Sequence, residues 1–104
     1  MELIRLKGVA TRIVFPLKNG TGALLSGCTG LDSEIDTYSD SVAPDGFVDC
    51  SNEATEIGTS GHYYLVLTAA EMNFSYIIVQ IKSVEAKTQT VIIKTMELII
   101  GVQI

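Results

Sequence analysis

Apolar and polar residues alternate with a period of two on both sides of one short polar segment. The alternation covers Tyr63–Leu67 and resumes over Tyr76–Lys82, which is the pattern of pleated strands. Between them, Thr68 stands three residues before Glu71, the spacing at which hydroxyl and carboxylate each cap a backbone N–H. This part of the chain therefore predicts two strands joined by a short helical turn near residues 69–73.

The same alternation, interrupted by Gly, Asn, Asp and Ser turns every 8 to 12 residues, predicts further short strands. They are expected at Ala10–Leu17, Leu31–Tyr38, Phe47–Cys50 and Thr88–Thr95, with Ala23–Leu25 as a candidate for a further brief strand. Pro16 lacks an N–H donor, so it should lie at a sheet edge or at the end of its strand. Because the chain has no long amphipathic helix and no βαβ unit, the pattern predicts an all-β, antiparallel β-sandwich of about seven strands.

The two ends extend this pattern. We expect residues 1–8 to form an N-terminal arm or edge strand, residues 9–95 the sandwich, and residues 96–104 an apolar C-terminal strand. That last strand either completes the core or is offered to the sheet edge of another subunit. Candidate assembly residues are the apolar residues of both ends and two tyrosines expected to face outward: Leu3, Ile4, Leu98, Ile99, Ile100, Val102, Ile104, Tyr64 and Tyr76.

Composition supports a surface that meets partners. Of the 104 residues, 47% are apolar and only 18% are charged, against about a quarter in typical soluble domains. Some outward strand positions must therefore be apolar or hydroxylated, and such a surface either meets a partner or risks aggregation. We accordingly expect a homo-oligomer.

The charge is unevenly distributed along the chain. The net charge of −5 argues against non-specific nucleic-acid binding. Residues 1–18 carry four basic residues against Glu2, whereas residues 32–56 carry eight acids and no Lys or Arg. In the Leu31–Tyr38 strand, Asp32, Glu34 and Asp36 are expected on the outer face. Such a distribution suits head-to-tail contact between copies or docking on a basic partner, unless the acids only solvate a long loop.

Residues for catalysis or metal binding are sparse. His62 is the only imidazole, so any Ser/His or Cys/His apparatus would need it, and we expect it to face solvent on a strand. Cys28 and Cys50 cannot complete a zinc site with one histidine, and we expect free thiols rather than a disulfide. The irregularly spaced acids predict no dedicated calcium site. The sequence predicts no enzyme, no cofactor and no metal.

Two further expectations concern location and the tyrosines. The first residues contain no apolar run typical of a signal peptide, and no run of about 18 apolar residues occurs, so we expect synthesis in a cytosol and no membrane contact. Tyr63 is expected in the core with its hydroxyl tying down a neighbouring turn. A carbohydrate- or receptor-binding module is the alternative function, with Tyr38, Tyr64 and the acidic loop lining a shallow site.

Several short motifs resemble a known group of proteins. Thr29-Gly30-Leu31, Asp45-Gly46-Phe47, Glu56-Ile57-Gly58, the segment from Gly61 to Asn73, and the ending Ile93-Lys94-Thr95 are together similar to small structural proteins of tailed bacteriophages. The resemblance spans about residues 9 to 95. It implies an immunoglobulin-like virion component without enzymatic activity, made in the bacterial host cytoplasm. It also implies that many copies contact one another and other virion proteins at the head exterior, the neck, or the tail and baseplate.

Overall fold

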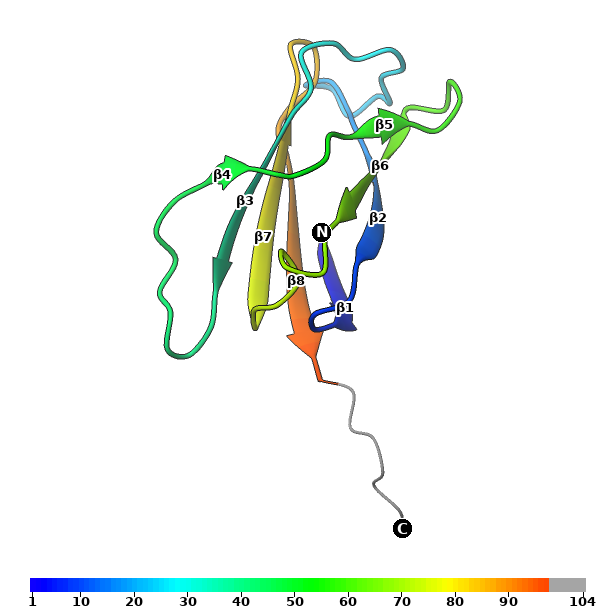
Figure 1. Cartoon of the computed structure of the whole chain (residues 1–104). Helices are drawn as coiled ribbons and strands as arrows, with labels where there is room; N and C mark the ends of the chain where they lie inside the picture. The colour runs from blue at the N-terminus through cyan, green and yellow to red at the C-terminus, as the bar shows by residue number, and fades with distance from the viewer. Residues whose placement is uncertain (98–104) are drawn as a thin grey trace.

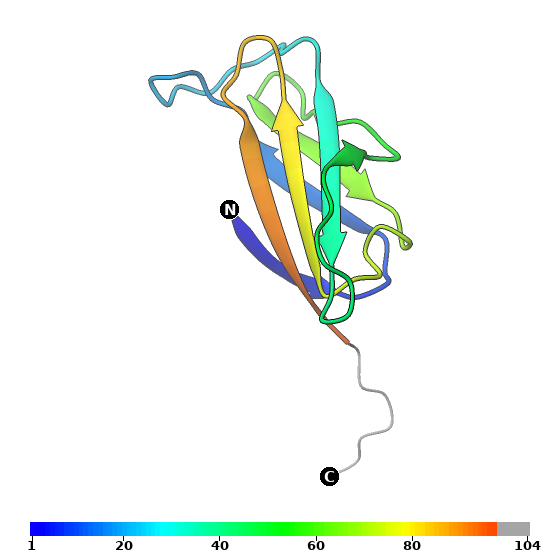
Figure 2. The same cartoon turned by 90° about the vertical axis from the view of Figure 1, so that its left-hand side faces the viewer.

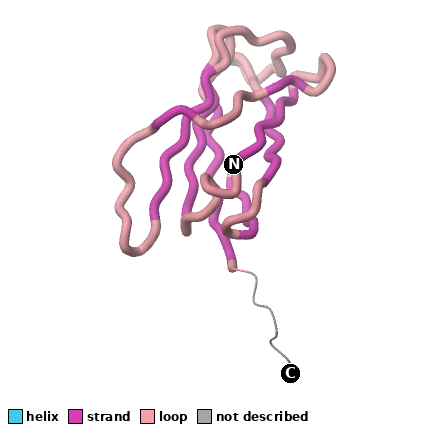
Figure 3. Tube along the Cα trace, viewed as in Figure 1, coloured by secondary structure: helices cyan, strands magenta, loops and turns pink. Residues whose placement is uncertain are grey.

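The computed structural model describes residues 1–97 and shows two β-sheets that face each other (Figures 1 and 2). The large sheet has the strand order β1-β8-β7-β3-β4, with bounds Glu2–Leu6, Gln89–Met96, Tyr76–Lys82, Asp32–Tyr38 and Val48–Asp49. The small sheet has the order β2-β6-β5, with bounds Thr11–Pro16, His62–Leu67 and Thr55–Glu56. The described residues contain no helix (Figure 3). The predicted all-β sandwich is confirmed, with eight strands in this part of the chain rather than about seven.

The strand order is immunoglobulin-like. Strands β3, β7 and β8 occupy the places of strands C, F and G, and β2, β6 and β5 those of B, E and D. All pairings are antiparallel except that of β1 with β8, which is parallel, in the register Glu2 with Ile92 to Leu6 with Met96. In the strand order of the large sheet, β1 lies at one edge and β4 at the other.

The core fills the space between the sheets because alternate residues of each strand point inward. The small sheet and its flanks contribute Ile13, Phe15, Leu17, Tyr63, Leu65 and Leu67, and the large sheet contributes Ile35, Ile77, Val79, Ile81, Val91 and Ile93. All are at most 4% exposed. Burial of each large aliphatic side chain contributes about 1.5–3 kcal/mol relative to exposure. The period of two in the sequence therefore accounts for the sandwich.

The predicted turn after β6 forms, as a single hydrogen-bonded turn. Thr68 N–H donates to Glu71 Oε1 at 2.8 Å, and Glu71 N–H donates to Thr68 Oγ1 at 3.1 Å, which is a reciprocal capping box. Met72 N–H donates to the Thr68 carbonyl at 3.0 Å, and the Met72 side chain is fully buried in the core. The turn closes one end of the sandwich.

Two short segments differ from the strands read from the sequence. The candidate strand at Ala23–Leu25 is absent, and only an isolated bridge joins Lys18 and Leu24. Asn19 Oδ1 accepts the N–H groups of Thr21 and Ala23, so the side chain satisfies backbone groups that a strand would pair. The short strand β5 was not expected, because its two residues carry no alternation to detect.

Asp36 is also placed differently from the expectation. Together with Asp32 and Glu34 it was expected on an open outer face of β3, but Asp36 is only 8% exposed. Its Oδ2 accepts the N–H of Gly46 at 3.3 Å, because the 39–46 loop folds back over this face. Pro16, in contrast, stands at the end of the edge strand β2, as predicted.

Candidate interaction surface

The outer face of the large sheet carries an apolar surface next to β1. Strand register aligns two rows of outward side chains across β1, β8, β7 and β3: Ile4, Lys94, Tyr76, Tyr38 in one, and Glu2, Ile92, Ile78, Asp36 in the other. Ile4 is 63% exposed and Ile92 is 37% exposed. Together with Tyr76, they line a shallow hollow of about 380 Å³. We call Ile4, Ile92 and Tyr76 the β1–β8 patch.

An aromatic pair supports this patch from the neighbouring strand. The rings of Tyr76 and Tyr38 stack with centroids 4.8 Å apart and planes 10° apart. Stacking of this kind contributes about 0.5–1.5 kcal/mol beyond area burial and holds Tyr76 in place. Lys94 and Glu2 complete the rim of the hollow. An apolar centre with a charged rim is the usual layout of a protein-binding surface.

The free edge of β1 exposes backbone groups beside this patch. Ile92 N–H donates to the Met1 carbonyl at 2.8 Å, and Lys7 N–H donates to the Met96 carbonyl at 2.8 Å. Backbone groups of successive strand residues point to opposite sides, so the odd-numbered residues of β1 face β8. The N–H and C=O groups of Glu2, Ile4 and Leu6 therefore point away from the sheet. Within residues 1–97, β8 is the only strand that pairs with β1.

Arg5 partly covers this edge. Its Nη1 donates to the carbonyl oxygen of Ile4 at 2.8 Å, which is one of the acceptors that face outward. A charged side chain folded over an edge is a common means of preventing sheet-to-sheet pairing. The protection consists of this single hydrogen bond.

Tyr64 lies on the opposite side of the molecule. It projects from the outer face of the small sheet, where the Arg12 guanidinium carbon stands 5.0 Å from the ring centroid. A second shallow hollow of about 410 Å³ is lined there by Asn52, Glu53, Tyr64 and Val66. Tyr64 and Tyr76 therefore belong to two separate surfaces.

The remaining predicted assembly residues are divided between the core and the end of the chain. Leu3 is half-buried and packs against the core, whereas its neighbour Ile4 points outward. Leu98, Ile99, Ile100, Val102 and Ile104 lie outside the described residues. Of the predicted set, the structure brings together Leu3, Ile4 and Tyr76, which all line the hollow beside β1.

The opposite edge of the large sheet is acidic. Carboxylate oxygens of Asp32, Glu34 and Asp49 lie within 4.8 Å of one another, close enough to share a cation. Lys82 Nζ, however, already contacts Glu34 Oε1 at 2.7 Å. Desolvation, with the charges of Glu34 and Asp49, raises the pKa of Asp32. Crowded like charges make this edge unfavourable for an acidic or apolar strand.

Several acids that looked like surface charges are structural acceptors. Glu56 accepts the N–H groups of Gly27 and Gly61, at 2.8 and 3.0 Å, and these bonds lower its pKa. Glu85 accepts the N–H and hydroxyl of Thr29, which lowers its pKa too. Glu56, at the end of the acidic stretch, and Glu85, outside it, therefore hold loops in place, which is a role that sequence spacing alone did not indicate.

Tyr63 has its predicted role, because its ring is in the core and its hydroxyl holds a neighbouring loop. Its ring is 1% exposed, and its hydroxyl donates to the Leu25 carbonyl while it accepts the Cys28 N–H, both at 3.0 Å. Burial raises the pKa of Tyr63 to about 12. Tyr63, Glu56 and Glu85 together hold the 25–29 loop, which sequence reasoning had left without a structural role.

Groups capable of chemistry are dispersed in the described part of the chain. His62 is half-buried on the outer face of the small sheet, and its recorded hydrogen bonds all use backbone atoms. Cys28 and Cys50 are free thiols, as expected. Burial raises the pKa of Cys50 to about 12, so the thiol stays protonated and a poor nucleophile. Among residues 1–97, no hydrogen bond joins either thiol to His62.

Comparisons with known proteins do not identify the partner or the role of this surface. Neither the known protein families nor the curated proteins include one that matches the chain. Residues 1–97 contain no helix with the length and apolar character required to cross a membrane.

Proposed function

We propose that this chain is a non-enzymatic structural subunit that acts by protein–protein assembly in multiple copies, as a component of a tailed bacteriophage particle. It would be made in the host cytoplasm and contact copies of itself and other virion proteins. The observation that carries the proposal is the outer edge of β1 beside the exposed β1–β8 patch, where no second strand of residues 1–97 pairs with the backbone. Such an edge is a template for pairing with another chain.

The residues of the phage-like motifs support a scaffold role. Met72 is fully buried, Thr68 and Glu71 form the capping box, and Thr29 is held by Glu85. Gly30 adopts a positive φ of 60°, and an added Cβ would stand 2.8 Å from Val84 Cγ2. The motifs therefore specify turns and core positions and not a reactive site. This is consistent with a subunit whose function is to fold and assemble.

The carbohydrate-binding alternative has less geometric support. It requires Tyr38 and Tyr64 to line one shallow site with the acidic loop. Tyr38 stacks on Tyr76 outside the large sheet, whereas Tyr64 lies outside the small sheet. The structure does not bring these two tyrosines together, so the predicted sugar platform does not form.

The proposal is tested on purified phage particles from the cell that makes this chain. Quantitative mass spectrometry should find the chain in multiple copies per particle, and electron microscopy with an antibody fragment should place it at the head exterior, neck or tail. Its absence from purified particles, together with a monomeric state at all concentrations, would exclude the proposal.

A further inference from the structure

The β1 edge has the dimensions of a site for one added strand. β1 is five residues long, and Glu2, Ile4 and Leu6 point their backbone groups outward. Ile4 and Leu6 are 63% and 36% exposed, so an added strand would also bury apolar side chains. Strand addition of this kind takes affinity from main-chain hydrogen bonds and specificity from alternate side chains.

The end of the same chain has a sequence that suits this site. Residues 98–104 read Leu-Ile-Ile-Gly-Val-Gln-Ile, with no charge and no proline. The even positions are all large and apolar: Leu98, Ile100, Val102 and Ile104. Seven residues match the five residues of β1 with room for a connection. The absence of charge also suits an edge whose neighbours are Ile4 and Ile92.

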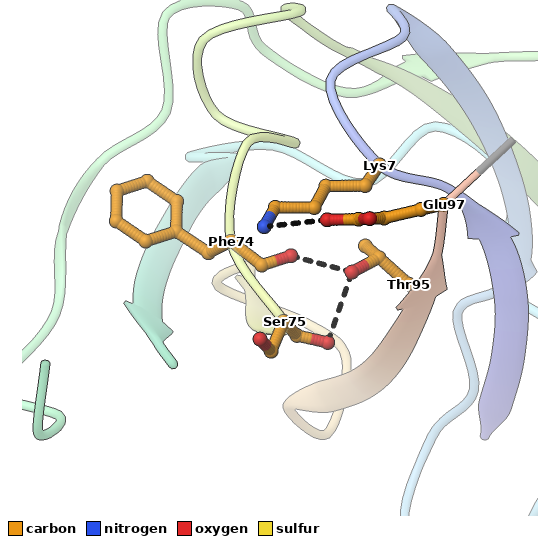
Figure 4. Close-up of polar contacts among 5 residues, drawn as sticks. All are labelled: Lys7, Phe74, Ser75, Thr95 and Glu97. Atoms are coloured by element: carbon orange, nitrogen blue, oxygen red, sulfur yellow. Dashed lines mark hydrogen bonds and ion pairs between the residues drawn. The ribbon is translucent and has the colours of Figure 1, made fainter. Parts of the chain in front are cut away.

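The point at which this segment leaves the sandwich is fixed. The Thr95 hydroxyl donates to the carbonyl oxygens of Phe74 and Ser75, at 2.6 and 3.1 Å (Figure 4). Lys7 Nζ pairs with Glu97 Oε1 at 3.5 Å in the same view. The Thr95 bonds hold the end of β8 beside the residues that lead into β7. The Lys7–Glu97 pair, with the bond from the Lys7 N–H to the Met96 carbonyl at 2.8 Å, holds it beside the end of β1. Residues 98–104 of any copy therefore start next to that copy's own β1.

A neighbour's segment fits the edge better than the chain's own. To reach its own free edge, the chain would cross over β1, a span of about 10 Å, which takes about three residues. Only about four residues would then remain to pair. The segment of a second copy approaches without this crossing and can lie along the whole of β1.

We infer that the β1 edge accepts, as an added strand, residues 98–104 of a second copy of this chain. The inference rests on the proposed function and names the partner for its assembly surface. The incoming strand replaces the Arg5 guanidinium at the Ile4 carbonyl and covers Ile4. Each copy carries one donor segment and one acceptor edge, so assembly proceeds by pairing the donor segment of one copy with the acceptor edge of another.

The test uses two full-length variants with complementary defects. Ile4→Pro removes an N–H that points to the free edge, and the β8 ladder stays intact because it uses the odd-numbered residues. The double variant Ile99→Pro and Ile100→Pro removes two successive donors from the segment while keeping it apolar. Ile4→Val and the double change Ile99→Val and Ile100→Val are the matched controls.

Sedimentation equilibrium over a wide concentration range gives the result. Each proline variant alone should associate at least about tenfold more weakly than the wild type, while the valine controls should associate normally. An equal mixture of the two proline variants should recover heterodimers that stop at two chains, because only one productive donor–acceptor pair remains. Circular dichroism should show unchanged β structure in every variant.

Other outcomes separate the two proposals. Normal association of the double proline variant, with loss in Ile4→Pro, would overturn the inference by assigning β1 another occupant, and the proposed function would stand. A wild type that is monomeric at every concentration would overturn the inference. If that monomer were also missing from purified particles, the proposed function would fall with it.

Discussion

The two edges of the large sheet differ in almost every respect that controls strand pairing (Figure 2). β1 presents five residues with an apolar face, and Arg5 covers it with one hydrogen bond. β4 presents two residues, and beside it Asp32, Glu34 and Asp49 crowd together. A short, acidic edge resists addition of another strand, whereas a longer apolar edge invites it. One sheet thus has a protected side and a receptive side.

The largest expected effect is the difference in the free energy of unfolding between proline substitutions at two neighbouring positions of β1. Leu3→Pro should lower the free energy of unfolding by about 3 kcal/mol, because it removes a bond to β8 and packing against the core. Ile4→Pro should cost about 1 kcal/mol or less, because its N–H points to the free edge. Urea unfolding followed by tyrosine fluorescence, below the concentration of association, measures both. Equal costs would show that the assignment of odd residues to β8 is wrong.

A smaller effect is expected from uncovering the β1 edge. Arg5→Ala frees the Ile4 carbonyl, so self-association should strengthen by about tenfold, the equivalent of one charge-assisted hydrogen bond. Arg12→Ala, on the edge strand of the small sheet, is the control and should leave association unchanged. Sedimentation velocity measures the shift. Weaker association in Arg5→Ala would show that the arginine contacts the partner instead of covering the edge.

The smallest effect concerns the pH dependence of stability through two acids, Asp32 at the acidic edge of the large sheet and Glu56 in β5 of the small sheet. The pKa of Asp32 is raised above its ordinary value of 3.8, so the folded state binds the proton more tightly than the unfolded state does. The resulting stability is present below pH 3.8 and is lost as pH rises from 3.8 through the pKa of the folded state. The pKa of Glu56 is lowered below 4.5, so its contribution is present above 4.5 and lost as pH falls through the folded-state value.

Substitutions at these two acids should therefore act in opposite directions. At neutral pH, Asp32→Asn should raise the thermal midpoint because it relieves repulsion with Glu34 and Asp49. Glu56→Gln should lower the midpoint because it weakens the bonds to the Gly27 and Gly61 N–H groups. Differential scanning calorimetry at neutral and acidic pH compares them. A lower midpoint for Asp32→Asn would show that this edge is stabilised by its charges.

Residues with local, periodic signals were predictable from the sequence. The alternation around Tyr63 and Ile77, and the spacing of Thr68 and Glu71, depend only on chain geometry, so the strands, the inward faces and the capped turn followed directly. The buried Tyr63 hydroxyl also followed, because a buried phenol needs a partner. These features require no knowledge of which strands are neighbours.

Long-range pairing was decided only by the tertiary structure. Nothing near Glu2 indicates that it pairs in parallel with Ile92, about ninety residues away, or that Asp36 is covered by the Gly46 loop. Parallel pairing arises when a strand lies beside another of the same direction, which depends on the packing of the whole sandwich. The sequence determined which residues form strands and which side of each strand is apolar. The fold determined which strands form the edges of the sheet built by residues 1–97, because an edge is defined by the neighbour that a strand lacks.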